Sequence, residues 1–95
     1  MQIEYEEFIG KARYIARPSG PHVELVVTDP TPQLRVAYYT AMSKGARSRT
    51  MAQALVKRMV EDARQSGRQI VPLCPFVRGE AEKNSDWADV IRDPA

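Results

Sequence analysis

The chain has 95 residues, of which 43% are hydrophobic and 27% charged, and its formal net charge is +2. These values describe one globular domain over residues 1–95 and exclude a disordered, fibrous or multidomain chain. The acidic start MQIEYEEFIGK is unlike a signal peptide and no apolar run is long enough to cross a membrane, so we expect a cytoplasmic protein with no membrane partner. Cys74 is the single cysteine and only His22 could join it at a metal, so we expect no disulfide within the chain and no metal site.

The first half of the chain predicts four short strands separated by turns. Gly10 permits a tight connection after the first strand, and the segments PSGP (18–21) and DPTP (29–32) have the Pro and Gly content of turns. Alternating, β-branched and aromatic residues predict the strands themselves. The expected strands cover residues 3–8, 12–17, 22–28 and 33–42.

The second half changes to a helical pattern. From Thr50 to Ser66 apolar residues recur three and four positions apart, which predicts one amphipathic helix, and Gly67 follows where a C-terminal cap is expected. Residues 68–77 then predict a buried strand, and the tail predicts a short helix, a turn and a second short segment that carries Trp87.

Strand, helix and strand over residues 33–77 form a crossover unit. The two strands should therefore run parallel with a right-handed connection, while the preceding hairpins should be antiparallel. The predicted fold class is α+β, with a mixed, mostly antiparallel sheet and the major helix packed on one face.

Positive charge gathers in residues 44–69. This segment contains seven Lys or Arg residues and only two acids, Glu61 and Asp62, so it carries +5. Such asymmetry indicates an anionic partner, either a nucleotide-like cofactor or nucleic acid, or else a solvated helix face. No nucleic-acid-binding motif is present, which places nucleic acid last among these alternatives.

The helix start KGARSRTMAQALV (44–56) permits two interpretations. Its free N–H groups, together with Arg47 and Arg49, could hold a phosphate, although Thr50 resists the positive φ that glycine supplies in such loops. Alternatively, Thr50 and Gln53 could form a capping box that uses some of the same donors. The local residues leave both interpretations open.

Prolines interrupt the predicted strand 68–77. Pro72 and Pro75 cannot donate hydrogen bonds to a neighbouring strand, so this is either an edge strand with a bulge or a strand that splays from its parallel neighbour. Splaying would leave a slot beside YYTAM (38–42), at the carboxyl ends of the parallel strands where open sheets bind ligands. Cys74 lies inside this strand, either as a small buried residue or as a chemically active thiol.

These parts resemble the small single-domain members of the GNAT N-acetyltransferase superfamily. ALVKRMVEDARQSGRQIVPLCPFV (54–77) is similar to that family's helix and following strand, including the Pro-x-Cys-Pro-Phe run. Residues 47–52 match the family's Arg/Gln-x-x-Gly-x-Gly/Ala loop at Arg47 and Ala52, with Thr50 in the first glycine position. YTAM (39–42) stands where relatives have His-Thr-Glu-Val, and NSDWADVI (84–91) resembles the family's tail.

The resemblance implies a GNAT-like fold with a splayed parallel pair that binds acetyl-CoA. Pyrophosphate would meet the backbone N–H groups of residues 48–52, pantetheine would run beside residues 40–42, and Cys74 would lie near the acetyl thioester as the candidate catalytic residue. The cofactor-binding residues implied in this way are Thr40, Met42, Arg47, Ser48, Arg49, Thr50, Met51 and Ala52.

Two functional classes remain open at this stage. One is an acetyl-CoA-dependent N-acetyltransferase-like protein that acts on an unknown amine, either a small molecule or a protein, as a monomer or weak dimer. The other is a coenzyme-A-binding or protein-interaction module whose catalysis has lapsed, which the lack of an evident general base favours because His22 and Glu24 are only loosely placed.

Overall fold

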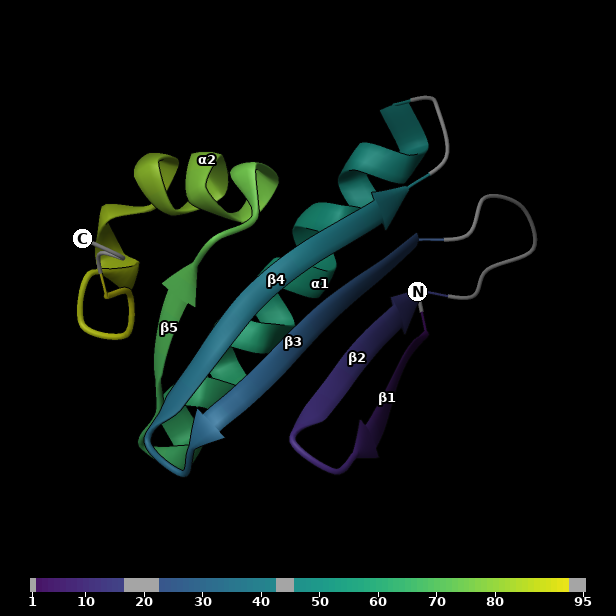
Figure 1. Ribbon diagram of the computed structural model, residues 1–95. Helices are drawn as coiled ribbons and strands as arrows, with labels where there is room; N and C mark the ends of the chain where they lie inside the picture. Colours follow the sequence, from purple (N-terminus) through teal and green to yellow (C-terminus); the bar gives the residue numbers. More distant parts are fainter. Residues whose placement is uncertain (1, 17–22, 43–45, 93–95) are drawn as a thin grey trace.

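A computed structural model describes residues 2–16, 23–42 and 46–92 of the chain, and these form one mixed sheet covered by a long helix (Figure 1). The expected turn 18–21, His22 and Lys44 lie outside the described residues, as does the side chain of Arg47. The elements in chain order are β1 (Ile3–Phe8), β2 (Lys11–Ala16), β3 (Val23–Thr31), β4 (Leu34–Met42), α1 (Ala46–Ser66), β5 (Gln69–Pro72), α2 (Pro75–Lys83) and the 3-10 turn η1 (Ser85–Trp87).

The five strands lie side by side in chain order, β1-β2-β3-β4-β5. The first four pair antiparallel, whereas β4 and β5 pair in parallel through the α1 crossover. The predicted α+β class, mixed sheet and crossover unit are confirmed.

The predicted break at residues 29–32 is wrong in its position. β3 continues to Thr31, and the turn falls at Pro32 and Gln33. The register shifts between Thr28 and Thr31, so that Thr31 pairs again with Leu34. An irregular strand end therefore accommodates Asp29 and Pro30, because Pro is tolerated where ladder pairing is interrupted.

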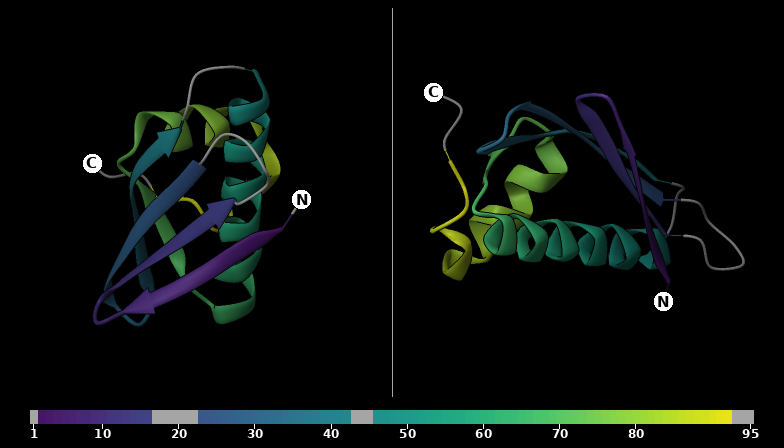
Figure 2. Two further views of the ribbon diagram at one scale, coloured as in Figure 1. Left: turned by 90° about the vertical axis from the view of Figure 1, so that its right-hand side faces the viewer. Right: turned by 90° about the horizontal axis from the view of Figure 1, so that it is seen from below.

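α1 packs along one face of the sheet and buries the predicted apolar stripe (Figure 2). Gly67 has a φ of 72°, and the Arg68 N–H bonds to the Ala63 carbonyl at 2.9 Å, so the glycine ends the helix as expected. The core contributed by α1 comprises Met51, Ala52, Leu55, Val56, Met59, Val60 and Ala63, which meet Val23, Leu25 and Val27 of β3.

α1 begins four residues earlier than the apolar stripe alone predicted. Its first residue is Ala46, so Thr50 lies in the second turn rather than at the N-cap. The predicted capping box at Thr50 is therefore wrong. Gln53, its expected partner, instead donates through Nε2 to Glu80 Oε2 at 3.3 Å.

The predicted strand 68–77 is also wrong beyond Pro72. β5 covers only Gln69–Pro72, and Pro75 is the first residue of α2. Pro suits this position because an N–H in the first helical turn would have no intrahelical partner, so its absence costs nothing, and because the φ of Pro is already helical. Cys74 is consequently the N-cap of a helix and not the middle of a strand.

The tail covers the outer edge of β5. The Ile70 N–H bonds to the Val90 carbonyl at 2.7 Å, and the Arg92 N–H bonds to the Ile70 carbonyl at 2.8 Å. Trp87 and Val90 are buried against the core cluster. These contacts pair the backbone of a strand edge that would otherwise be exposed.

A buried arginine ties the strands together at the end of the sheet that lies near the C-terminus of α1. Arg35 is 2% exposed and makes a two-point bond to Asp29, with Nε–Oδ1 at 2.8 Å and Nη2–Oδ2 at 3.0 Å. It also donates to the hydroxyls of Tyr14 at 2.9 Å and Tyr5 at 2.8 Å. The Tyr14 hydroxyl donates in turn to Asp62 of α1 at 2.8 Å.

We call these five residues, Tyr5, Tyr14, Asp29, Arg35 and Asp62, the anchored end. Burial and then the bond to Asp62 raise the pKa of Tyr14 above its ordinary value, so the tyrosine stays protonated as the donor of this link. The network joins β1, β2, β3, β4 and α1 by charge-assisted hydrogen bonds.

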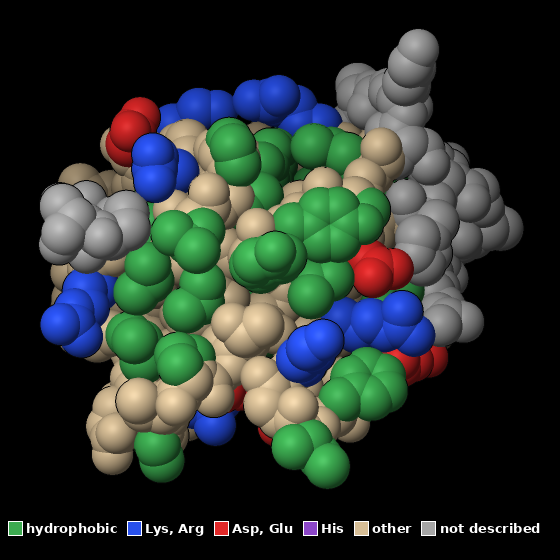
Figure 3. All heavy atoms as spheres, in the orientation of Figure 1, with side chains coloured by type: hydrophobic (Ala, Val, Ile, Leu, Met, Phe, Trp, Pro, Cys, Tyr) green, Lys and Arg blue, Asp and Glu red, His purple; other side chains and the backbone are tan. Residues whose placement is uncertain are grey.

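The face of the sheet opposite α1 is rich in hydrophobic side chains (Figure 3). Tyr38 and Tyr39 of β4 are exposed, as is Leu73, which follows β5. Among the described residues, no helix is both long enough and apolar enough to span a membrane.

Candidate functional site

Three elements meet where β4 ends. The C-terminal half of β4 (38–42), the first two turns of α1 (46–53) and the segment from Cys74 to Glu80 contact one another, and we call this region the junction. It lies at the end of the sheet opposite the anchored end (Figure 1). Carboxyl ends of parallel strands are the usual ligand sites of sheets that have crossover helices.

The parallel strands separate at the junction, which is one of the two outcomes that the prolines left open. β5 pairs with β4 only from Leu34 to Ala37, while β4 continues to Met42. At the parting point the N–H groups of Leu73 and Cys74 both bond to the Ala37 carbonyl, at 3.1 and 3.0 Å. This shared acceptor turns the chain away from β4 and into α2.

Cys74 lies where the chain leaves the sheet. Its side chain is 4% exposed, and Sγ lies 3.2 Å from the hydroxyl of Thr40 on β4. As N-cap of α2 it has extended backbone angles and makes no side-chain capping bond. The thiol therefore stands at the positive end of a helix dipole, beside one hydroxyl of the separated strand.

The start of α1 contains a buried polar atom that has no partner. Ser48 lies in the first turn, its side chain is fully buried, and its Oγ makes no hydrogen bond to the described part of the chain. The N–H groups of the first three helical residues, here 46–48, also lack intrahelical acceptors. An unsatisfied hydroxyl costs about 1–3 kcal/mol when buried, so a ligand atom that pairs with it would recover this energy.

Arg49 links the starts of the two helices. Its guanidinium carbon lies 5.8 Å from the centroid of the Phe76 ring, within cation–π range. Thr50 follows it on the exposed face of α1, where its φ is negative like that of every described residue except Gly10 and Gly67. The position therefore requires no glycine for its backbone conformation.

The remaining predicted cofactor residues differ in their exposure. Thr40 is half-buried and Met42 is 40% exposed, so both β4 side chains lie at the junction with accessible surface. Met51 and Ala52 are buried in the core, and a ligand could reach only their backbone. The structure thus places Thr40 beside Cys74, and Arg49 beside Phe76 in the first turn of the helix that Cys74 caps.

Comparison with protein families matches residues 3–90 to the GCN5-related N-acetyl-transferase model Acetyltransf_CG. The chain belongs to this family. A comparison with curated proteins found no match. Family membership establishes an acetyltransferase-like protein, and the mixed sheet with its crossover helix is compatible with the fold of these enzymes.

Two residues at this acetyltransferase-like junction were missed by the sequence patterns. Glu80 is 6% exposed, although RGEAEK reads as a solvated helix segment, and Phe76 was assigned to a strand. Glu80 is buried because α2 packs on α1, and this tertiary contact leaves no local sequence signal. A helix that starts at Pro75 places Phe76 and Glu80 about one turn apart on the same face, so the proline was the signal that could have found both residues.

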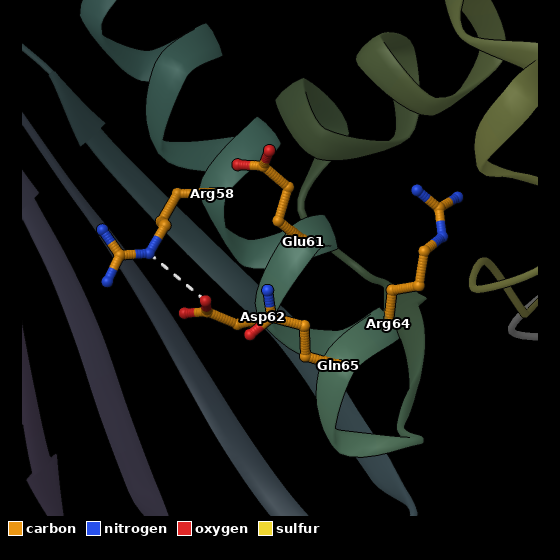
Figure 4. A pocket seen from close by; sticks show the side chains of 5 residues that line it. All are labelled: Arg58, Glu61, Asp62, Arg64 and Gln65. Atoms are coloured by element: carbon orange, nitrogen blue, oxygen red, sulfur yellow. Dashed lines mark hydrogen bonds and ion pairs between the residues drawn. The ribbon is translucent and has the colours of Figure 1, made fainter.

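The basic segment of α1 behaves differently in its second half. A hollow of about 450 Å³ is lined by Arg58, Glu61, Asp62, Arg64 and Gln65. Figure 4 shows the side chains of these residues along α1. Arg58 pairs with Asp62 at 3.2 Å, and Arg64 pairs with Asp89 at 2.7 Å. Because these arginines have carboxylate partners, this part of the segment is a solvated helix face, and the anion-binding interpretation applies to the first turns alone.

Proposed function

We propose that the protein is an acetyl-CoA-dependent N-acetyltransferase-like protein whose junction holds the coenzyme. The observation that carries this proposal is the buried, unpartnered Ser48 hydroxyl in the first turn of α1. It stands among free backbone N–H groups at the positive end of a 21-residue helix, in a chain of the N-acetyltransferase family. The donor set fits a pyrophosphate, which offers several anionic oxygen acceptors.

The pyrophosphate would lie against the first turn of α1. The N–H groups of residues 46–48 have no intrahelical acceptor, whereas those of residues 49–52 face carbonyls one turn back. The expected contact with residues 48–52 therefore shifts toward the start of the helix. Arg49, and Arg47 from its place in the sequence, would add positive charge there.

Thr50 affects affinity through its side chain in this proposal, and not through its backbone. Its φ is negative within a regular helix, so replacing glycine with threonine introduces no strain. The exposed side chain still adds bulk on the helix surface beside the phosphate position. We infer a working site of reduced affinity.

The rest of the coenzyme would follow β4 to the thiol. Pantetheine would run beside Thr40 and Met42, where β4 no longer pairs with β5. When bound, acetyl-CoA supplies an acetyl group activated as a thioester. Thr40 would orient the Cys74 thiol through their 3.2 Å contact, and the dipole of α2 would favour negative charge on the sulfur.

Cys74 would either lie beside the thioester or accept the acetyl group transiently. In the second case a bond forms between Sγ and the acetyl carbon, the coenzyme's sulfur–carbon bond breaks, and the thiol proton leaves on the coenzyme sulfur. An acceptor amine then takes the acetyl group, and the amine's proton returns to Sγ. Both steps are acyl transfers without a change of oxidation state.

The acceptor would be an amine on a small molecule or a protein. Among the described residues, the hydroxyl of Thr40 is the polar side chain within hydrogen-bonding distance of Cys74, and a hydroxyl is a poor general base. This observation favours the second candidate function, a module that binds coenzyme A without turnover.

Incubation with acetyl-CoA separates these two functions. Mass spectrometry of the intact chain and of its Cys74 peptide should find one added acetyl group, which Cys74→Ala abolishes, and an added amine pool should then be acetylated. Cys74→Ser serves as the size-matched control. Coenzyme binding without acetylation of either Cys74 or amines would favour the binding module, and no binding at all would overturn both.

A further inference from the structure

Glu80 is a buried carboxylate to which the proposed chemistry assigns no role. Its side chain is 8% exposed and lies between α2 and α1. Oε2 accepts from Gln53 Nε2 of α1 at 3.3 Å and pairs with Lys83 Nζ of its own helix at 3.4 Å. A second polar contact, from Asn84 Nδ2, goes to the backbone carbonyl of Glu80 and leaves the carboxylate untouched.

A buried carboxylate is energetically unfavourable at this position. Burying its charge costs free energy that one amide and one exposed lysine repay only in part, and an apolar residue of similar size often gives equal or greater stability. Lys83 is 57% exposed, so its contribution is screened by solvent. Stability alone therefore does not explain Glu80.

The geometry of the contact suggests a positional role. Arg49 contacts Phe76, and Gln53 contacts Glu80. The two α1 residues are four positions apart, and so are the two α2 residues. Residues four apart lie on one face of a helix, so these pairs fix how far α2 lies along α1 and how it is rotated. Either a slip or a rotation of α2 would break the Gln53–Glu80 bond first, because it depends on direction and distance.

Cys74 is carried by the same helix. It is the N-cap of α2, six residues before Glu80, which corresponds to about 9 Å along a helix axis. Its contact with Thr40 depends on where α2 begins relative to β4. Displacing α2 on α1 would therefore separate the thiol from Thr40.

We propose that Glu80 is a positioning residue that, through Gln53, holds α2 in the register that keeps Cys74 beside Thr40. This proposal rests on the proposed function for its catalytic consequence, but its structural part concerns the protein without ligand. Glu80 touches neither the thiol nor the coenzyme position, and it acts only through the placement of α2.

The reactivity of Cys74 tests the proposal, since Cys74 is the single cysteine of the chain. The rate of alkylation by iodoacetamide is compared among wild type, Glu80→Leu, Glu80→Gln and the control Glu82→Leu at an exposed site on α2. Glu80→Leu should react about tenfold faster, because loss of the interhelix bond favours local opening of α2. Glu80→Gln should stay near wild type because its amide oxygen still accepts from Gln53, and Glu82→Leu should not change.

A positioning role also makes stability and reactivity diverge. The urea midpoint of Glu80→Leu should be equal to or above that of wild type, while kcat for acetyl transfer falls and KM for acetyl-CoA stays constant, since the pyrophosphate contacts are on α1. Alkylation that is unchanged in Glu80→Leu, or that rises only in proportion to a loss of global stability, would overturn the proposal. If Glu80→Leu does not fold, Gln53→Met removes the other side of the Gln53–Glu80 hydrogen bond, and its alkylation rate provides the same test.

Failure of the proposed function would be seen separately. If wild type transfers no acetyl group and acetyl-CoA does not protect Cys74 from alkylation, the coenzyme function fails, while the alkylation rates of the ligand-free variants still decide whether Glu80 positions α2.

Discussion

The two ends of α1 use polar side chains for opposite purposes. At the anchored end, Arg35 makes four hydrogen bonds to Asp29, Tyr14 and Tyr5, and Tyr14 passes the link on to Asp62. At the junction, the fully buried Ser48 hydroxyl has no partner and the thiol of Cys74 has one contact, with Thr40. The polar groups of one end are satisfied within the protein, whereas the other end holds a donor that the proposed function assigns to a ligand.

This difference is consistent with the proposal that one helix serves as both anchor and coenzyme site. The fixed C-terminal half of α1 holds its N-terminal turns in place, so an orphan hydroxyl can be tolerated there at a cost of about 1–3 kcal/mol. Unsatisfied polar groups are kept at functional sites when surrounding contacts supply the stability. The following changes probe each end, beginning with the largest expected effect.

Arg35→Met should damage the anchored end most. It leaves the half-buried Asp29 with only its longer ion pair to Arg68, at 3.6 Å, and removes the donors to both tyrosines, so the free energy of unfolding should fall by about 3 kcal/mol. Urea unfolding measures the loss. Arg58→Met, which removes a partly exposed ion pair to Asp62, should change stability by less than about 0.5 kcal/mol. Similar effects in both variants would show that the buried network has no special role.

Tyr14→Phe should remove the link between Arg35 and Asp62 and lower stability by about 1–2 kcal/mol at neutral pH. The pKa of Tyr14 is raised in the folded state, so its stabilisation is complete below the unfolded-state pKa of about 10 and declines as pH rises above it. The difference between wild type and Tyr14→Phe should therefore shrink in alkali. Tyr38→Phe, at an exposed tyrosine, provides the control, and a constant difference across pH would contradict the account.

Ser48→Ala should have opposite effects on stability and binding. Removing a buried hydroxyl without a partner should raise the free energy of unfolding by about 1 kcal/mol, while the affinity for acetyl-CoA falls because the alanine lacks the donor. Urea unfolding measures the free energy of unfolding, and calorimetric titration measures the affinity for acetyl-CoA. The hydroxyl of Ser66 bonds to the Ala63 carbonyl near the anchored end. Ser66→Ala should therefore neither raise the free energy of unfolding nor lower the affinity for acetyl-CoA. A loss of stability in Ser48→Ala would show that the hydroxyl is satisfied.

Thr50→Gly should give a small loss of stability, to which helix propensity contributes a few tenths of a kcal/mol. Its affinity for acetyl-CoA should increase, because the backbone of the first turns becomes accessible to phosphate. Gln65→Gly introduces glycine at an exposed position in the other half of α1 and should leave affinity unchanged. Weaker binding in Thr50→Gly would mean that the threonine contributes to the site.

The sequence predicted the sheet and its helix well because both have strong periodic signals. The alternation of strands and the apolar stripe from Met51 to Ala63 correspond directly to buried faces. The prolines left open either a bulged edge strand or a separated one, and the structure shows β5 separating from β4. Residue-level resemblance to the N-acetyltransferase family supplied the rest of the fold prediction, and the family comparison supports it.

The predictions were wrong at positions where a residue is compatible with two different local structures. Thr50 and Gln53 fit a capping box, but Ala46 to Arg49 already form a helical turn, and helix boundaries carry weak signals. Pro75 fits a strand edge as well as a helix start, and this ambiguity misplaced Cys74, Phe76 and Glu80. The unpartnered state of Ser48 depends on packing and leaves no trace in sequence.

The most direct test of the comparison between the two ends is a titration of isotopically labelled protein with acetyl-CoA, followed by amide chemical shifts. We predict shifts at residues 40–42, 46–52 and 73–77, with the signals of Arg35, Tyr14 and Asp62 unchanged. Shifts centred on the anchored end, or no shifts in a large excess of acetyl-CoA, would contradict the central claim that the junction is the coenzyme site.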